Sequence, residues 1–170
     1  STTQFDGYIA TPPAGAGRPV LVLHAWWGLN NTIKAFCGRL AQAGFLALAP
    51  DLYHGRVATT IPEAEALGGA LDANEGQARA EIAAAADLLG KLAGPAGDGL
   101  AVIGFSLGAY YALRHAAADP QRVRSVVLFY GSGPADYGAS RADYLGHYAG
   151  NDPYEPAENV DYLEGALRSA

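Results

Sequence analysis

The sequence has little charge, a single cysteine and no basic cluster. Only 16% of the 170 residues are charged, the net charge is −6, and Lys and Arg nowhere gather in one segment. Binding to nucleic acid or to an anionic membrane requires a basic surface, so neither is predicted as a partner. Half of the residues are apolar, which is typical of a compact chain that forms one domain over residues 1–170.

Further absences narrow the class of protein. Cys37 is the only cysteine, so the sequence predicts neither an intrachain disulfide nor a Cys/His zinc site. It falls in a helical pattern, where a buried, unreactive thiol is expected. The first residues have neither the charged nor the apolar part of a signal peptide, and no run of about 18 apolar residues could span a bilayer. We therefore expect a cytoplasmic protein without a metal site.

Short apolar runs alternate with helical patterns along the chain. Most of the runs lack polar alternation, as is usual for parallel strands that are covered on both faces. The order predicts an α/β protein with a doubly wound, mostly parallel sheet. The expected strands are residues 20–25, 45–49, 100–104, 123–130 and 144–148, with an antiparallel edge strand within 4–10. The first expected helix has its pattern over 33–41, with Asn31 as the N-cap and Gly44 as the end. Further helices are expected over 74–92, 107–117 and 156–168.

The motif with the clearest chemistry is Gly104-Phe105-Ser106-Leu107-Gly108, which lies between a predicted buried strand and a predicted helix. Two glycines permit the sharp turn that lifts a Ser106 hydroxyl above the sheet. The same turn aims the Leu107 N–H, at the positive end of the helix, toward developing negative charge. A solvated serine in a glycine-rich turn is the alternative, but the strand–turn–helix setting favours a nucleophile.

Two other segments fit this interpretation. The sequence His24-Ala25-Trp26-Trp27-Gly28 ends an earlier predicted strand, where α/β-hydrolases place the second backbone donor of the oxyanion hole. Asp152 follows the predicted strand 144–148, and an acid after the nucleophile fits the order Ser, Asp/Glu, His. Core packing of the tryptophans and an ordinary Asp-Pro turn remain open as alternatives.

Four motifs together resemble the dienelactone hydrolase family over essentially the whole chain. They are LHAWWGLN at 23–30, APDLY at 49–53, GFSLG at 104–108 and GHYAGNDPYEP at 146–156. The resemblance implies an α/β-hydrolase fold with an eight-stranded core, and hydrolysis of small carboxylic esters or lactones without a cofactor. The residue roles that it implies are catalysis by Ser106 and Asp152, an oxyanion hole at Trp26 and Leu107, and substrate contacts at Trp27, Tyr53 and Arg56.

The sequence departs from the best-known family members at two positions. Ser106 stands where they have a cysteine, and Ala25 stands where they have the glutamate that is tied to that cysteine. The two changes are consistent, because a serine needs a histidine base at the moment of attack. The sequence therefore resembles a serine-esterase branch. Arg56 is a candidate for holding a substrate carboxylate, with a solvated loop arginine as the alternative.

The expected histidine base is missing from its family position. The family places it about thirty residues beyond the acid, after Ala170. His115 is turned away on the predicted nucleophile helix, His147 lies in a strand, and His24 is expected to orient the oxyanion loop. His54 is the one loop candidate.

We therefore expect a chain that is incomplete, lacks the last strand and helix of the fold, exposes an apolar sheet edge and is inactive alone. A non-catalytic ligand-binding homologue and a thioesterase or acyltransferase remain alternatives. The sequence gives no indication of oligomeric state.

Overall fold

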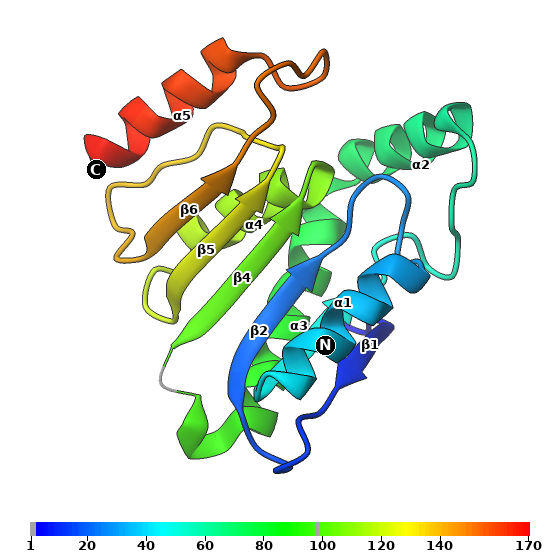
Figure 1. The fold of residues 1–170 in the computed structure, drawn as a ribbon, viewed down its shortest axis with the longest axis vertical. Helices are drawn as coiled ribbons and strands as arrows, with labels where there is room; N and C mark the ends of the chain where they lie inside the picture. The colour runs from blue at the N-terminus through cyan, green and yellow to red at the C-terminus, as the bar shows by residue number, and fades with distance from the viewer. Residues whose placement is uncertain (1–2, 98) are drawn as a thin grey trace.

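A six-stranded sheet runs through the middle of the computed structural model, which describes residues 3–97 and 99–170 (Figure 1). The strand order is β1-β3-β2-β4-β5-β6; β1 pairs antiparallel with β3 and every other pairing is parallel. The strands are β1 (Gly7–Ala10), β2 (Arg18–Leu23), β3 (Phe45–Pro50), β4 (Leu100–Phe105), β5 (Val123–Phe129) and β6 (Asp143–His147). The predicted sheet is thus present, including its antiparallel edge strand.

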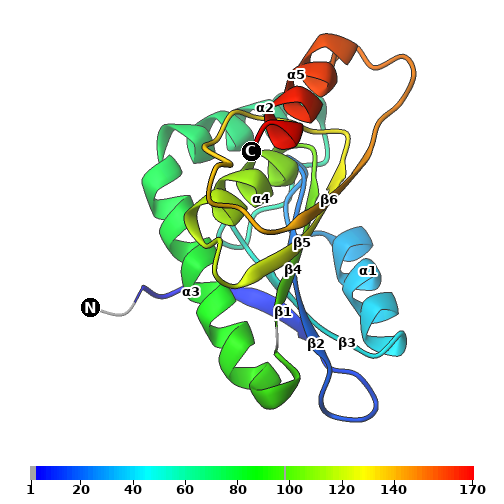
Figure 2. The ribbon, with the colours of Figure 1, turned by 90° about the vertical axis from the view of Figure 1, so that its left-hand side faces the viewer.

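Helices cover both faces of this sheet, as the doubly wound prediction requires (Figure 2). They are α1 (Asn31–Gln42), α2 (Ile61–Ala73), α3 (Glu75–Ala93), α4 (Leu107–Ala118) and α5 (Ala157–Arg168), with a short 3₁₀ turn at Gly94–Ala96. Helix α1 lies on one face, and α3 and α4 lie on the other. Helix α2 lies near the edge where the parallel strands end (Figure 1).

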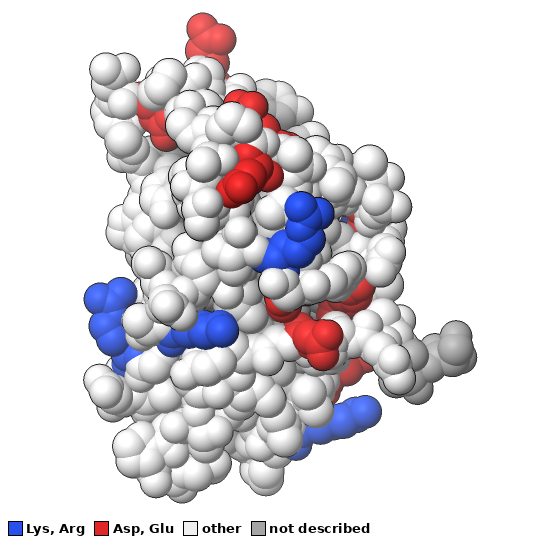
Figure 3. Space-filling view, turned by 90° about the vertical axis from the view of Figure 1, so that its right-hand side faces the viewer, with Lys and Arg blue, Asp and Glu red and all other residues white. Residues whose placement is uncertain are grey.

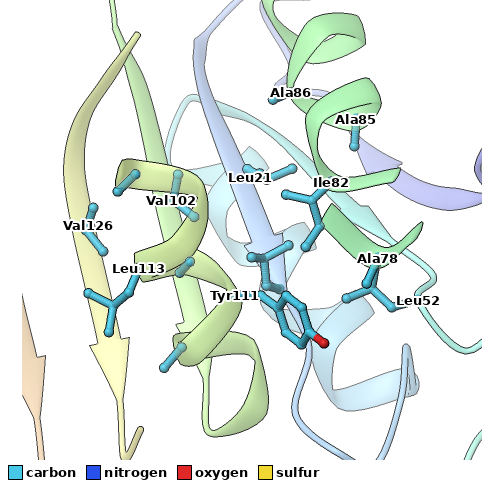
Figure 4. Close-up of a cluster of buried hydrophobic side chains, with 14 of the residues drawn as sticks. Leu21, Leu52, Ala78, Ile82, Ala85, Ala86, Val102, Tyr111, Leu113 and Val126 are labelled. Atoms are coloured by element: carbon cyan, nitrogen blue, oxygen red, sulfur yellow. The ribbon is translucent and has the colours of Figure 1, made fainter. Parts of the chain in front are cut away.

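The main hydrophobic core lies between the sheet and the pair α3 and α4 (Figure 4). Ile82 of α3 and Tyr111 of α4 are fully or almost fully buried against Leu21 and Val102 of the strands. Each such large side chain contributes about 1.5–3 kcal/mol of burial free energy. Small residues such as Ala85 let α3 lie close to the sheet. The packing fixes where α4 begins, and therefore where Ser106 lies.

One helix prediction needs correction, and one helix was not predicted. The N-cap of α1 is Asn30 and not Asn31: its side chain accepts a hydrogen bond from the Ile33 N–H at 3.2 Å, the usual cap geometry. Helix α2 is absent from the sequence-based expectations. Its start carries a capping box, in which Thr60 and Glu63 satisfy each other's backbone N–H groups. That pair was the signal that could have predicted α2.

Strand β6 forms an exposed, partly apolar edge of the sheet. Leu145 is 54% exposed, in line with the expected exposed edge. On the face that carries α1, Phe129 stacks on Phe105 at a ring distance of 4.9 Å and His147 stacks on Phe129 at 4.7 Å. These side chains form an aromatic row across β4, β5 and β6. None of the helices in residues 3–97 and 99–170 combines the length and apolar character needed to cross a bilayer.

Candidate active site

Ser106 occupies the sharp turn that the sequence predicts between β4 and α4. Its backbone has φ 51° and ψ −113°, a left-handed conformation that strains any residue with a side chain. A Cβ on Gly104 would overlap the backbone of Gly108 and Ala109, and one on Gly108 would overlap the carbonyl oxygens of Leu23 and His24. The two glycines therefore allow β4, the turn and α4 to meet.

The turn is also held from the side of β5. The Ser106 N–H donates to the Phe129 carbonyl at 2.8 Å. Two residues further on, Gly131 lies so close to the Ser106 carbonyl that an added Cβ would overlap it. The nucleophile candidate is thus fixed by neighbouring backbone on two sides, and its side chain is half-buried.

The two predicted oxyanion donors lie in neighbouring segments. The Trp26 N–H finds no acceptor in the part of the chain that the structure describes. Leu107 is the first residue of α4, so its N–H is among the four that a helix leaves unpaired. A Cβ placed on Gly68 of α2 would lie 3.4 Å from Leu107 Cδ1 and 3.8 Å from Trp26 Cβ. Both side chains therefore lie close to Gly68 of α2, a helix that the sequence-based interpretation missed.

His24 joins residues 24–28, called here the oxyanion loop after its predicted role, to the segment after β3. Its Nδ1 donates to the Ala25 carbonyl at 2.7 Å, and its Nε2 accepts from the Leu52 N–H at 3.2 Å. The ring is completely buried, and burial lowers its pKa. A neutral imidazole suits this arrangement, because Nε2 must keep a lone pair. His24 thus links the loop after β2 to the loop after β3.

Asp152 lies in the loop between β6 and α5. Its Oδ1 accepts from the N–H groups of Tyr154 at 2.8 Å and Glu155 at 3.2 Å. Its Oδ2 has no hydrogen-bond partner among the described residues. The Tyr154 ring meets the Trp26 ring edge to face at 5.7 Å. The acid candidate therefore lies in a loop that contacts the oxyanion loop, and one of its oxygens is free to bind a base.

The four histidines are engaged elsewhere. Within residues 3–97 and 99–170, no hydrogen bond joins a histidine to Ser106 or Asp152. His24 is bound as described, His54 contacts the buried Glu81 carboxylate through Nε2 at 2.9 Å, and His147 stacks on Phe129. His115 is buried in the last turn of α4. The loop histidine His54 is therefore tied to α3 instead of facing the serine.

The three predicted substrate contacts do not share one pocket. Trp27 lines a cavity of about 400 Å³ with Phe105 and Tyr130, beside the nucleophile turn. Tyr53 and Arg56 line a different cavity of about 350 Å³ on the side of α2 and α3. Arg56 is exposed, as a solvated loop arginine would be.

The Tyr53 hydroxyl faces the site more directly. It is buried without a hydrogen-bond partner among the described residues. It would lie 3.6 Å from a Cβ placed on Gly68, beside Leu107. Burial raises the pKa of this phenol, so its proton is retained at neutral pH. Of the pair that lines the second cavity, Tyr53 is thus the one close to the oxyanion residues.

A metal site needs grouped ligand side chains, and a polyanion site needs a basic surface. Among the described residues, no group of three or more His, Cys, Asp or Glu side chains could hold a metal ion. On the face drawn in Figure 3, acidic and basic side chains are interspersed, and those described there form no continuous basic surface.

Comparisons with known proteins agree on one family. A family model described as "Dienelactone hydrolase family" matches residues 5–170. "Protein usf" of Aquifex pyrophilus is 36% identical over 132 residues, 75% of this chain and 57% of that protein. A "Putative carboxymethylenebutenolidase" of Salmonella typhi is 31% identical over 184 residues, 98% of this chain and 67% of that protein.

A crystal structure supports the same relationship. The structure of a "Putative Dienelactone Hydrolase" from Klebsiella pneumoniae subsp. pneumoniae matches with a TM-score of 0.77 and 28% identity, covering 96% of this chain and 75% of that one. The chain spans 57% of the length of its Aquifex pyrophilus relative.

Proposed function

Because this chain belongs to the dienelactone hydrolase family and has the α/β-hydrolase fold, we propose that it is the serine-nucleophile part of a hydrolase for small carboxylic esters or lactones. The observation that carries the proposal is the left-handed Ser106 between β4 and α4, followed directly by Leu107 as the first residue of α4. Asp152, with one oxygen free, follows in the chain order of the fold.

In the proposed reaction Ser106 Oγ attacks the acyl carbon and passes its proton to a base. The Trp26 and Leu107 N–H groups bind the oxyanion of the tetrahedral intermediate. The ester C–O bond then breaks, and the leaving alcohol takes the proton from the base. Water attacks the acyl-enzyme in the same way, which releases the acid and restores the Ser106 hydroxyl.

The base in this proposal is a histidine other than His24, His54, His115 and His147, oriented by Asp152. Asp152 is suited to the role because its Oδ1 is held by backbone N–H groups while Oδ2 remains available. No metal or cofactor takes part in any step.

The proposal is tested with Ser106→Ala in the intact protein. The variant should lose turnover of p-nitrophenyl acetate by about 10⁴-fold or more and should not be labelled by a fluorophosphonate probe. Ser125→Ala, at an exposed serine of β5, is the matched control and should keep both properties. Wild-type turnover in Ser106→Ala would refute the proposal.

One observation favours a second candidate function. The four histidines have other positions or partners, which would suit a non-catalytic protein that keeps the pocket and binds a ligand without cleaving it. That function predicts ligand binding to the intact protein with no turnover even when Ser106 is present. A thioesterase or acyltransferase would use the same Ser106 and differ in its substrate or acceptor, so thioester substrates and alcohol acceptors separate these reactions.

A further inference from the structure

The loop between β6 and α5 (Figure 1) contains Asp152, whose carboxylate binds backbone N–H groups of the same loop. Because Oδ1 accepts both the Tyr154 and the Glu155 N–H, the position of the carboxylate and the path of the next residues are coupled. Much of this loop is exposed: Asn151, Pro153 and Tyr154 are all open to solvent. A loop with so few buried contacts needs other anchors to hold a side chain in one place.

The side chains of Tyr154 and Glu155 provide contacts to two different segments. Tyr154 is 70% exposed and reaches the oxyanion loop through its ring contact with Trp26. Glu155 is half-buried, and its Oε1 accepts a hydrogen bond from Ser132 Oγ at 2.5 Å. A hydroxyl bound to a carboxylate at this distance forms a charge-assisted bond, roughly twice as strong as a neutral one. Glu155 is therefore the stronger anchor of the loop.

Ser132 lies in the segment that holds the nucleophile turn. It follows Gly131, whose backbone touches the Ser106 carbonyl, and that segment continues from Phe129, which accepts the Ser106 N–H. Tyr148 fastens the same segment by donating its hydroxyl to the Gly131 carbonyl at 2.9 Å. Burial, together with the nearby Glu155 carboxylate, raises the pKa of Tyr148 to about 12, so this donor keeps its proton.

We propose that Glu155, held by Ser132, is a positioning residue that sets the place of the Asp152 carboxylate relative to Ser106. The inference rests on the proposed serine-hydrolase function. It adds a direct structural connection between the Asp152 loop and the segment that holds Ser106, and this connection does not involve the base. Displacing a catalytic group by about 1 Å can cost a hundredfold in rate. Loss of this one anchor, with the Tyr154 contact retained, should cost less.

The main test is Ser132→Ala in the intact protein, assayed with p-nitrophenyl acetate. The kcat should fall about tenfold while KM changes less than twofold, because a misplaced acid slows proton transfer without altering the binding cavity. Ser132→Thr keeps the hydroxyl and should restore kcat. Adding Glu155→Gln to Ser132→Ala should lower kcat no further, since the two side chains act as one unit.

A second readout does not depend on activity. Hydrogen exchange at the Tyr154 and Glu155 amides, which Asp152 Oδ1 accepts, should accelerate in Ser132→Ala and return to the wild-type rate in Ser132→Thr. Glu158→Gln, an exposed carboxyl at the start of α5, is the control and should change neither kcat nor exchange. An unchanged kcat in Ser132→Ala, or an equal loss in Glu158→Gln, would overturn the inference.

The failure of this inference can be told from the failure of the proposed function. If Ser106→Ala keeps wild-type turnover, the serine-hydrolase function is wrong. If Ser106→Ala is inactive and Ser132→Ala has wild-type kcat, only the positioning role is wrong.

Discussion

Buried histidines are the residues at which pH acts on this protein. His24 is completely buried, and its Nε2 accepts the Leu52 N–H. His115 is almost fully buried in α4, and its Nε2 has no hydrogen-bond partner among the described residues. Burial is the largest cause that lowers the pKa of each ring; the Ala25 carbonyl and Asp119, respectively, oppose the shift in part.

The lowered pKa values predict that the protein loses stability in mild acid. In the unfolded chain these histidines take up protons as the pH falls below about 6.5, while the folded rings stay neutral. Stability is therefore full above that pH and decreases below it, by about 1.4 kcal/mol per pH unit for each histidine until its folded pKa is reached.

Urea denaturation at a series of pH values between 7.5 and 5 measures this slope. His115→Asn should make the slope shallower than in the wild type, because one of the two linked groups is gone. Ser125→Ala, at an exposed serine that does not titrate in this range, is the control and should leave the slope unchanged. If the free energy of unfolding changed equally with pH in all three proteins, His115 would not be a cause of the pH dependence.

Single residues differ in how far the sequence can predict them. Ser106, Gly104 and Gly108 are predictable because the turn has strict backbone requirements that only certain residue types meet. The bond between Ser132 and Glu155 is not, since it joins side chains that no local pattern relates. Their meeting depends on how two loops leave neighbouring strands, which is decided by the packed sheet.

Among the secondary-structure elements, α4 and α1 differ in how much space their glycines leave. Helix α4 begins against the carbonyls at the end of β2, and Gly108 fills the point of contact. Gly38 in α1 has no neighbouring atom within 4 Å of an added Cβ. The same change, glycine to alanine, should therefore have opposite effects in the two helices.

We predict that Gly108→Ala destabilises the protein by about 1–3 kcal/mol, as overpacking does, and reduces labelling of Ser106. Gly38→Ala should stabilise it by about 0.5–1 kcal/mol, because alanine is the better helix former. Thermal denaturation and fluorophosphonate labelling of both variants check the pair. A Gly108→Ala protein with wild-type stability would mean that α4 can move away from β2 at little cost.

The strands and helices were predictable where apolar or helix-forming residues follow one another without interruption in the sequence. Four central strands and the two edge strands β1 and β6 were expected within a few residues of their observed bounds. The central strands are plain apolar runs, as is usual for buried parallel strands. Helix α2 was not predicted, because Gly68 and Gly69 interrupt its run of helix-forming residues. Its position depends on packing over Trp26 and Leu107, which a one-dimensional pattern does not describe.

For the whole molecule, the order of chemical groups along the chain was the most useful signal. Strand, serine turn, further strands and then Asp152 define the fold family, and the six-stranded sheet with helices on both faces agrees with it. The family resemblance implied that Trp26 and Leu107 share one site, and both side chains lie within 4 Å of a Cβ placed on Gly68. It also implied one set of substrate contacts, whereas Arg56 and Trp27 line separate cavities.

The oxyanion loop also gives the protein a built-in optical probe. Trp26 and Trp27 are the only two tryptophans of the sequence, so all indole emission originates beside the proposed site. Neither ring is fully buried, and one touches Tyr154 of the acid loop. Acylation of Ser106 or movement of that loop should therefore change the fluorescence intensity or emission maximum of the unlabelled protein. A fluorophosphonate titration followed by emission would count active sites directly, and Ser106→Ala should give a flat trace.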